Sequence, residues 1–137
     1  MAELTDAARA FLGEPRFATV ATNDGTDAPQ MSVVWYELQG DVLSFSTGTG
    51  NRKYRNIEAN PRVSVCVEDG YRYVVLRGTA TFEHDADAVR ADIEGQATRY
   101  LGPEQGPGMA AMINGSPHVL VRVAVDHVTV YGFDGQP

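Results

Sequence analysis

The residues best suited to chemistry form a glycine-rich segment that leads into a predicted helix, Thr47-Gly48-Thr49-Gly50-Asn51-Arg52-Lys53. Glycines let backbone amides approach an anion, and the first turn of a helix adds unpaired N–H groups and a partial positive charge. Arg52 and Lys53 add formal charge. The segment therefore predicts a phosphate cradle, although its Arg-Lys-x-Arg spacing also suits a solvated basic helix.

This segment differs from two common nucleotide-binding patterns. Gly50 is followed by Asn51-Arg52-Lys53-Tyr54 rather than by Gly-Lys-Ser/Thr, which excludes a Walker A loop. The third glycine of a dinucleotide-binding fingerprint is also missing. A cradle here would therefore bind some other phosphate-bearing ligand.

Charge supports a small anionic ligand. The chain has a net charge of −7, which argues against a general nucleic-acid binder, and Lys53 is its only lysine. Arg52, Lys53, Arg55 and Arg62 nevertheless fall within eleven positions. A local positive cluster on an acidic chain indicates one small anion rather than a long polyanion.

A second candidate is the run Gln30-Met31-Ser32-Val33-Val34-Trp35-Tyr36, in which polar and apolar positions alternate. Its backbone could edge a flat ring, and Gln30 and Ser32 could bond ring heteroatoms. An ordinary half-buried strand has the same pattern, so both interpretations stay open.

The other reactive side chains indicate no nucleophilic or metal chemistry. The histidines at 84, 118 and 127 lack metal-ligand spacing from one another and from Cys66. Cys66 sits on an apolar strand, which favours a buried inert thiol over a nucleophile. No Gly-x-Ser-x-Gly elbow supports a hydrolase. An apolar pocket, or simply a core, could be built from Tyr71, Tyr73, Tyr100, Met109 and Met112.

The elements that must position these residues follow from periodicity and turn residues. Six strands with short turns and few helices predict a small antiparallel barrel, because closure removes exposed sheet edges. The expected helices span 5–13, 51–60, 85 or 87 to about 100, and 109–113, with an irregular stretch over 102–108. The expected strands span 17–22, 30–38, 42–46, 62–68, 73–83 and 119–133, the last as a strand pair or one long bent strand.

Length and composition set the remaining limits. The 137 residues fit a single domain, 1–137, and 43% hydrophobic content is enough for a core. No apolar run is long enough to span a membrane, and Met1 to Ala10 lack a secretory pattern. The single cysteine, Cys66, fits a reducing compartment, so we expect a cytoplasmic protein.

The order of motifs resembles the pyridoxamine 5′-phosphate oxidase-like split β-barrel family, and more closely its deazaflavin branch, which uses coenzyme F420. The resemblance is clear over about residues 5–83 and returns at 118–121 and 127–132, whereas residues 85–117 match little beyond being helical. The motifs that carry it are Phe17-Ala18-Thr19-Val20-Ala21-Thr22, Asp24-Gly25, Pro29-Gln30-Met31-Ser32, Ser44-Phe45-Ser46, Lys53-Tyr54-Arg55-Asn56-Ile57 and Asn60-Pro61-Arg62-Val63-Ser64.

The resemblance implies a mostly β (β+α) fold, a six-stranded antiparallel split β-barrel with short flanking helices of the FMN-binding type. It also implies a homodimer with two cofactor sites at the interface. One protomer would offer Gln30, Met31, Ser32, Val33, Val34, Ser46, Thr47, Asn51, Arg52 and Lys53. The other would offer Tyr71, Tyr73 and Arg77, together with His118. Asn51 and His118 stand where relatives often place an arginine.

The activity implied is F420-dependent hydride transfer to an unsaturated or heteroaromatic small molecule, with no partnership with nucleic acid or membrane. The cofactor performs that chemistry, so no catalytic acid or base is named, and a water or Tyr71 could protonate the product. Two alternatives stay open: an FMN-dependent oxidoreductase of the same family, and a non-catalytic flavin- or deazaflavin-binding protein.

Overall fold

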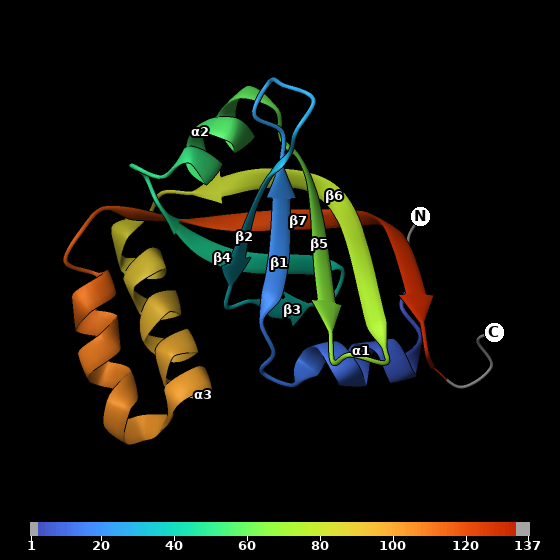
Figure 1. The fold of residues 1–137 in the computed structure, drawn as a ribbon. Helices are drawn as coiled ribbons and strands as arrows, with labels where there is room; N and C mark the ends of the chain where they lie inside the picture. Colours follow the sequence, from blue (N-terminus) through green and yellow to red (C-terminus); the bar gives the residue numbers. More distant parts are fainter. Residues whose placement is uncertain (1–2, 134–137) are drawn as a thin grey trace.

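The computed structural model describes residues 3–133, so the ends of the predicted 1–137 domain lie outside the described residues. These residues form one curled seven-stranded antiparallel sheet with three helices around it (Figure 1). The strand order is β2-β1-β5-β6-β7-β4-β3. The mostly β, split-barrel fold class is thereby confirmed, with seven strands instead of six.

The elements are α1 (Asp6–Gly13), β1 (Ala18–Thr22), β2 (Gln30–Val34), β3 (Glu37–Gln39), β4 (Val42–Gly48), α2 (Arg52–Ala59), β5 (Arg62–Glu68), β6 (Tyr73–Glu83), α3 (Ala86–Ile113) and β7 (His118–Tyr131).

The additional strand arises because the predicted strand 30–38 is wrong as a single element. β2 pairs with β1, β3 pairs with β4, and Trp35 and Tyr36 between them belong to neither ladder. Tyr36 is fully buried, and its hydroxyl donates to the Leu12 carbonyl oxygen at 2.9 Å. The chain therefore crosses from one half of the sheet to the other at Tyr36. The run Val33-Val34-Trp35-Tyr36 interrupts the alternation, but an unbroken apolar run also occurs within buried strands, so periodicity alone did not reveal the crossing.

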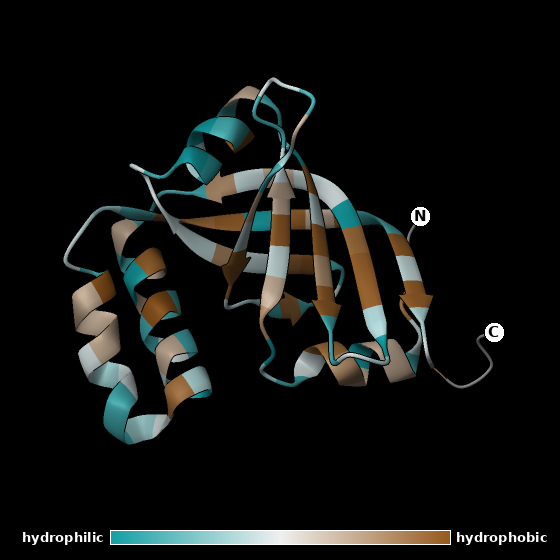
Figure 2. Ribbon diagram, viewed as in Figure 1, coloured by the Kyte–Doolittle hydropathy of each residue, from teal (hydrophilic) through white to brown (hydrophobic). Residues whose placement is uncertain are grey.

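The core lies inside the curl of the sheet, closed at one end by α1. Alternation places Val63, Val65 and Val67 of β5 inward, each at most 2% exposed, as the sequence predicts. Phe11 and Leu12 of α1 join the same cluster. Hydrophobic residues accordingly alternate with polar ones along the strands in Figure 2. The core fixes the strands whose ends carry the candidate site.

The last segment is one long strand, which settles the alternative left open by the sequence. β7 pairs with β6 over nearly its whole length, with one register shift where Arg77 faces His127 and Gly78 faces Val125. A Cβ atom on Gly78 would lie 2.1 Å from the Ala124 carbonyl oxygen, so the shift requires glycine at this position.

The helical segment α3 is a hairpin of two antiparallel arms (Figure 1). The predicted irregular stretch 102–108 is wrong, because only Gly102 has non-helical dihedral angles (φ 88°). Pro103 follows directly, at a first helical position where its missing N–H is tolerated. Gly106 lets the arms approach, since a Cβ there would lie 2.8 Å from the Thr98 Cα. None of the helices described is both long and apolar enough to cross a membrane.

Candidate functional site

A cavity of about 340 Å³ opens between β2, β4, the start of α2 and the second arm of α3. Its volume falls in the lower part of the range of small-molecule sites. No carboxylate lines it. Seven of the predicted site residues do: Val33, Val34, Ser46, Thr47, Asn51, Lys53 and His118. The other lining residues are Phe17, Trp35, Gly48, Met109 and Ile113.

Lys53 is the central charged group of this cavity. It is only 8% exposed, and its Nζ donates to the Ser32 Oγ at 2.7 Å. The ammonium also lies 6.0 Å from the centroid of the Phe45 ring. Among the ion pairs of residues 3–133, none includes Lys53. Burial lowers its pKa. A buried ammonium without a carboxylate is costly, and a bound anion would remove that cost.

The start of α2 adds hydrogen-bond donors to the same end of the cavity. Asn51 is the N-cap, but its side chain caps no backbone N–H, and the first turn holds no acidic residue. Its Nδ2 instead donates to the Thr47 Oγ1 at 3.4 Å. The first N–H groups of the helix thus keep their capacity to bind an anion. Arg52, predicted for this site, is exposed on α2 and does not line the cavity.

The three predicted residues at the start of β2 have different surroundings. Ser32 does not line the cavity, but its hydroxyl oxygen accepts the hydrogen bond from the Lys53 ammonium. Gln30 accepts hydrogen bonds from Thr22 Oγ1 at 3.3 Å and from Asn56 Nδ2 at 3.4 Å, so its amide oxygen supports α2. Met31 points outward and is 62% exposed.

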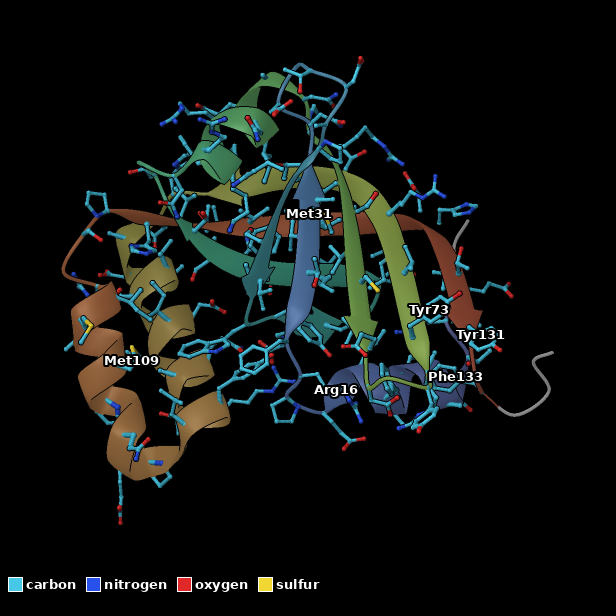
Figure 3. All side chains as sticks on the ribbon, viewed as in Figure 1. Arg16, Met31, Tyr73, Met109, Tyr131 and Phe133 are labelled. Carbon is cyan, nitrogen blue, oxygen red and sulfur yellow. The ribbon has the colours of Figure 1, made fainter. Side chains whose placement is uncertain are left out.

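Tyr71, Tyr73 and Arg77 lie away from this cavity within one chain. Tyr71 is exposed in the β5–β6 turn, and Tyr73 stacks on Tyr131 with 5.4 Å between ring centroids. Figure 3 places that pair at the opposite side of the molecule from Met109. Arg77 lines a separate cavity beside Arg62. His118, expected with this group, instead lines the chain's own cavity, and its Nδ1 lies 2.9 Å from the Ser116 carbonyl oxygen.

Sequence reasoning missed most of the apolar wall. Trp35 stands in the strand pattern and Met109 among the pocket candidates, but neither entered the predicted site. Phe17 and Ile113 were not predicted for the site, because an apolar residue at a strand or helix end usually belongs to the core. Phe17 is instead 62% exposed at the cavity. Among the described residues, no group of three or more His, Cys, Asp or Glu could hold a metal ion.

A split antiparallel barrel whose one cavity joins a buried cation to apolar walls can hold a ligand that is both anionic and apolar. The chain belongs to the pyridoxamine 5′-phosphate oxidase family, whose model matches residues 4–132. The family membership predicted from the motif order is thereby confirmed, and it supports a flavin or deazaflavin as the cofactor.

Individual proteins similar to this chain agree with its assignment to the family. The chain is 29% identical over 106 residues to the F420H(2)-dependent biliverdin reductase of Mycobacterium tuberculosis, covering 76% of this chain and 77% of that protein. A solved structure described as an F420 reductase is also 29% identical, with a TM-score of 0.77 over 92% of this chain and 98% of that one. A conserved hypothetical protein of M. tuberculosis shares the fold, with 23% identity, a TM-score of 0.79, and coverage of 95% and 86%.

Proposed function

We propose that this protein is an F420-dependent oxidoreductase that transfers a hydride to an unsaturated or heteroaromatic small molecule in the cytoplasm. The observation that carries the proposal is Lys53, a buried ammonium without a carboxylate partner at the polar end of a cavity. The two similar proteins named for F420 support the deazaflavin over FMN.

The residues of this chain fit the cofactor's phosphate and ring. Lys53, Asn51 and the first N–H groups of α2 would hold the phosphate, and Ser32 would orient the Lys53 ammonium. Val33 and Val34 would flank the ring and exclude water. When bound, the reduced deazaflavin supplies the hydride. The cavity contributes orientation and a low dielectric, so no nucleophile is required.

The proposal includes a homodimer. The outer face of β2, β1, β5 and β6 carries no helix, because α1, α2 and α3 lie at its borders (Figure 1). Met31 and Val33 are 62% and 65% exposed on this face, beside the small residues Ala21 and Thr19. Burying this face against a second copy would bring the partner's tyrosines toward the cavity. That is the role we propose for Tyr71, Tyr73 and Arg77.

One observation favours a second candidate, a protein that binds a flavin or deazaflavin without catalysis. Lys53 and His118 are the only acid–base side chains in the cavity lining, and Lys53 is assigned to the phosphate, so His118 alone would be left to protonate a product. Binding and turnover therefore have to be measured separately.

The test starts from binding. Purified protein is titrated with F420 and with FMN while the fluorescence of Trp35, the only tryptophan, is followed. We expect F420 to bind and to quench Trp35, which lines the cavity. Oxidation of reduced F420 is then followed with enones, quinones and tetrapyrroles. Binding of neither cofactor would contradict both oxidoreductase functions, and F420 binding without turnover on any acceptor would favour the carrier.

A further inference from the structure

The apolar end of the cavity is built by elements that the cofactor-binding residues do not use. Phe17 follows α1 and Trp35 follows β2, whereas Met109 and Ile113 come from the second arm of α3. β2 begins beside α2, where Lys53 lies, and ends toward α1 and α3 (Figure 1). Met109 belongs to the second arm of α3, which lies farther from the sheet than the first arm in this view (Figure 3), and its side chain lines the cavity. The cavity therefore has a cationic end and an apolar end.

The apolar end joins partly buried residues to an exposed one, because Trp35 and Ile113 pack against the core under α3 whereas Phe17 is open to solvent. A phenylalanine that is 62% exposed, as Phe17 is, would lose water contact if a ligand covered it. Two aromatic rings, a thioether and an isoleucine line this end, and none of them carries a charge. Aromatic side chains favour stacking with flat rings. The ligand that fits is flat, conjugated and weakly polar.

The aromatic wall is held from outside the cavity by Tyr100. Its ring stacks on Trp35 with 5.2 Å between centroids and an interplanar angle of 14°, and it lies 5.9 Å from Phe17. Its hydroxyl donates to the Arg16 carbonyl oxygen at 2.6 Å and accepts from the Tyr36 backbone N–H at 3.1 Å. Tyr100 itself does not line the cavity.

These bonds compensate for a gap in the sheet. The chain leaves the β2 ladder at Trp35, so the Tyr36 N–H and carbonyl have no strand partner. Tyr100 bonds the N–H, and Arg99 donates to the carbonyl. Arg99 also donates to the Gly13 carbonyl oxygen at 3.1 Å. The end of the first α3 arm thus fixes the backbone that carries Trp35.

We propose that the apolar end binds the flat conjugated part of the hydride acceptor, and that Tyr100 is the positioning residue that holds its aromatic wall. This inference rests on the proposed function. An electrophilic carbon of the acceptor gains the hydride as a C–H bond breaks on the reduced deazaflavin. A proton from water then completes the two-electron reduction.

The first experiment needs no cofactor. 1,4-Naphthoquinone is titrated into the protein and its quenching of Trp35 gives a Kd. Met109→Ala removes a wall residue and should weaken this Kd by about tenfold. Met112→Ala is the matched control, because Met112 lies on the same arm, is 74% exposed and does not line the cavity. Equal effects of the two variants would overturn the subsite.

Tyr100→Phe tests positioning, because it keeps the ring and removes only the hydroxyl. We expect the near-ultraviolet circular dichroism of Trp35 to fall and the naphthoquinone Kd to weaken about three- to tenfold. The Kd for F420 should stay within about twofold, since Lys53 and α2 are untouched. An unchanged Trp35 signal and quinone Kd would overturn the role of Tyr100.

Binding and turnover measurements together distinguish a failure of the acceptor subsite from a failure of the proposed function. If the wild-type protein binds naphthoquinone but not F420, the proposed function fails, and the subsite's role as an acceptor site fails with it. If F420 binds and Met109→Ala weakens F420 rather than the quinone, only the acceptor subsite fails. A raised KM for naphthoquinone in Met109→Ala, with F420 affinity intact, supports it.

Discussion

At the residue scale, Lys53 is the side chain whose surroundings matter most. Its pattern alone suited a solvated helix face as well as a phosphate cradle. The structure buries it to 8% exposure, against Ser32 and without a carboxylate. A cation held in this way stabilises the folded protein little by itself, because desolvation opposes the charged form. It is better suited to binding an anion.

We expect Lys53→Met to weaken F420 binding by about 1.5–3 kcal/mol, because a charge-assisted hydrogen bond to phosphate is lost. Isothermal titration calorimetry measures this change. Arg9→Met is the control, since Arg9 pairs with Asp41 at 2.7 Å and does not line the cavity. Full affinity in Lys53→Met would mean that another group binds the phosphate.

Burial lowers the pKa of Lys53, so its ammonium loses its proton at a lower pH than a free lysine does. The affinity for F420 should therefore fall as the pH rises, beginning at a lower pH than an exposed lysine would give.

At the scale of elements, the α3 hairpin is the part that connects the site to the barrel. Its first arm anchors Trp35 through Tyr100, and its second arm contributes Met109 and Ile113. The packing of the two arms and the docking of the first arm on β3 therefore determine the cavity's shape. Both contacts can be tested by stability measurements.

We expect Gly106→Ala to destabilise the protein by about 1–3 kcal/mol, because the new methyl group would meet the Thr98 backbone at 2.8 Å. Gly108→Ala is the matched control on the same arm. Nothing lies within 4 Å of a Cβ at Gly108, so alanine there should be neutral or slightly stabilising. Urea unfolding followed by circular dichroism measures both variants. A neutral Gly106→Ala would show that the arms can separate freely.

Docking of the first arm brings Asp92 close to Glu37, whose Oε1 accepts from Gln96 Nε2 at 2.9 Å. Burial, and then the charge of Glu37, raise the pKa of Asp92 to about 6, while Arg122 acts in the opposite direction. The folded state therefore holds this proton more tightly than the unfolded state, whose value is 3.8. The resulting stabilisation is complete below about pH 4 and is lost as pH rises through about 6.

Asp92→Asn should consequently raise the free energy of unfolding at pH 7–8 by about 1–2 kcal/mol and change it little at pH 4. Urea unfolding at several pH values checks this. Glu94→Gln, an exposed residue on the same arm, is the control and should have no such pH dependence. An equal effect of Asp92→Asn at both pH values would contradict the assignment.

At the scale of the whole molecule, the uncovered outer face of the sheet and the distant tyrosines point to the same arrangement. Within one chain the cavity lacks Tyr71, Tyr73 and Arg77. A second copy seated on Met31 and Val33 would complete it. The oligomeric state and cofactor affinity are then coupled.

Met31→Glu should dissociate the dimer and weaken F420 binding together, because it places a charge in an apolar interface. Sedimentation velocity measures the mass, and Trp35 quenching measures the affinity. Met112→Glu changes another exposed methionine, on α3, and should alter neither the mass nor the affinity. A wild-type protein that is monomeric and binds F420 fully would contradict the dimeric site.

The sequence by itself determined the local features. Glycines before a basic helix predicted a phosphate cradle that includes Lys53, alternation identified the inward valines of β5, and motif order identified the family. Only the tertiary structure decided that the chain changes strand partner at Tyr36, that Gly102 turns α3 into a hairpin, and that Phe17, Trp35, Met109 and Ile113 meet. Periodicity reports which face of an element is buried, and turn residues report where it ends. Neither reports which distant element covers that face, because that choice depends on packing between residues far apart in the chain.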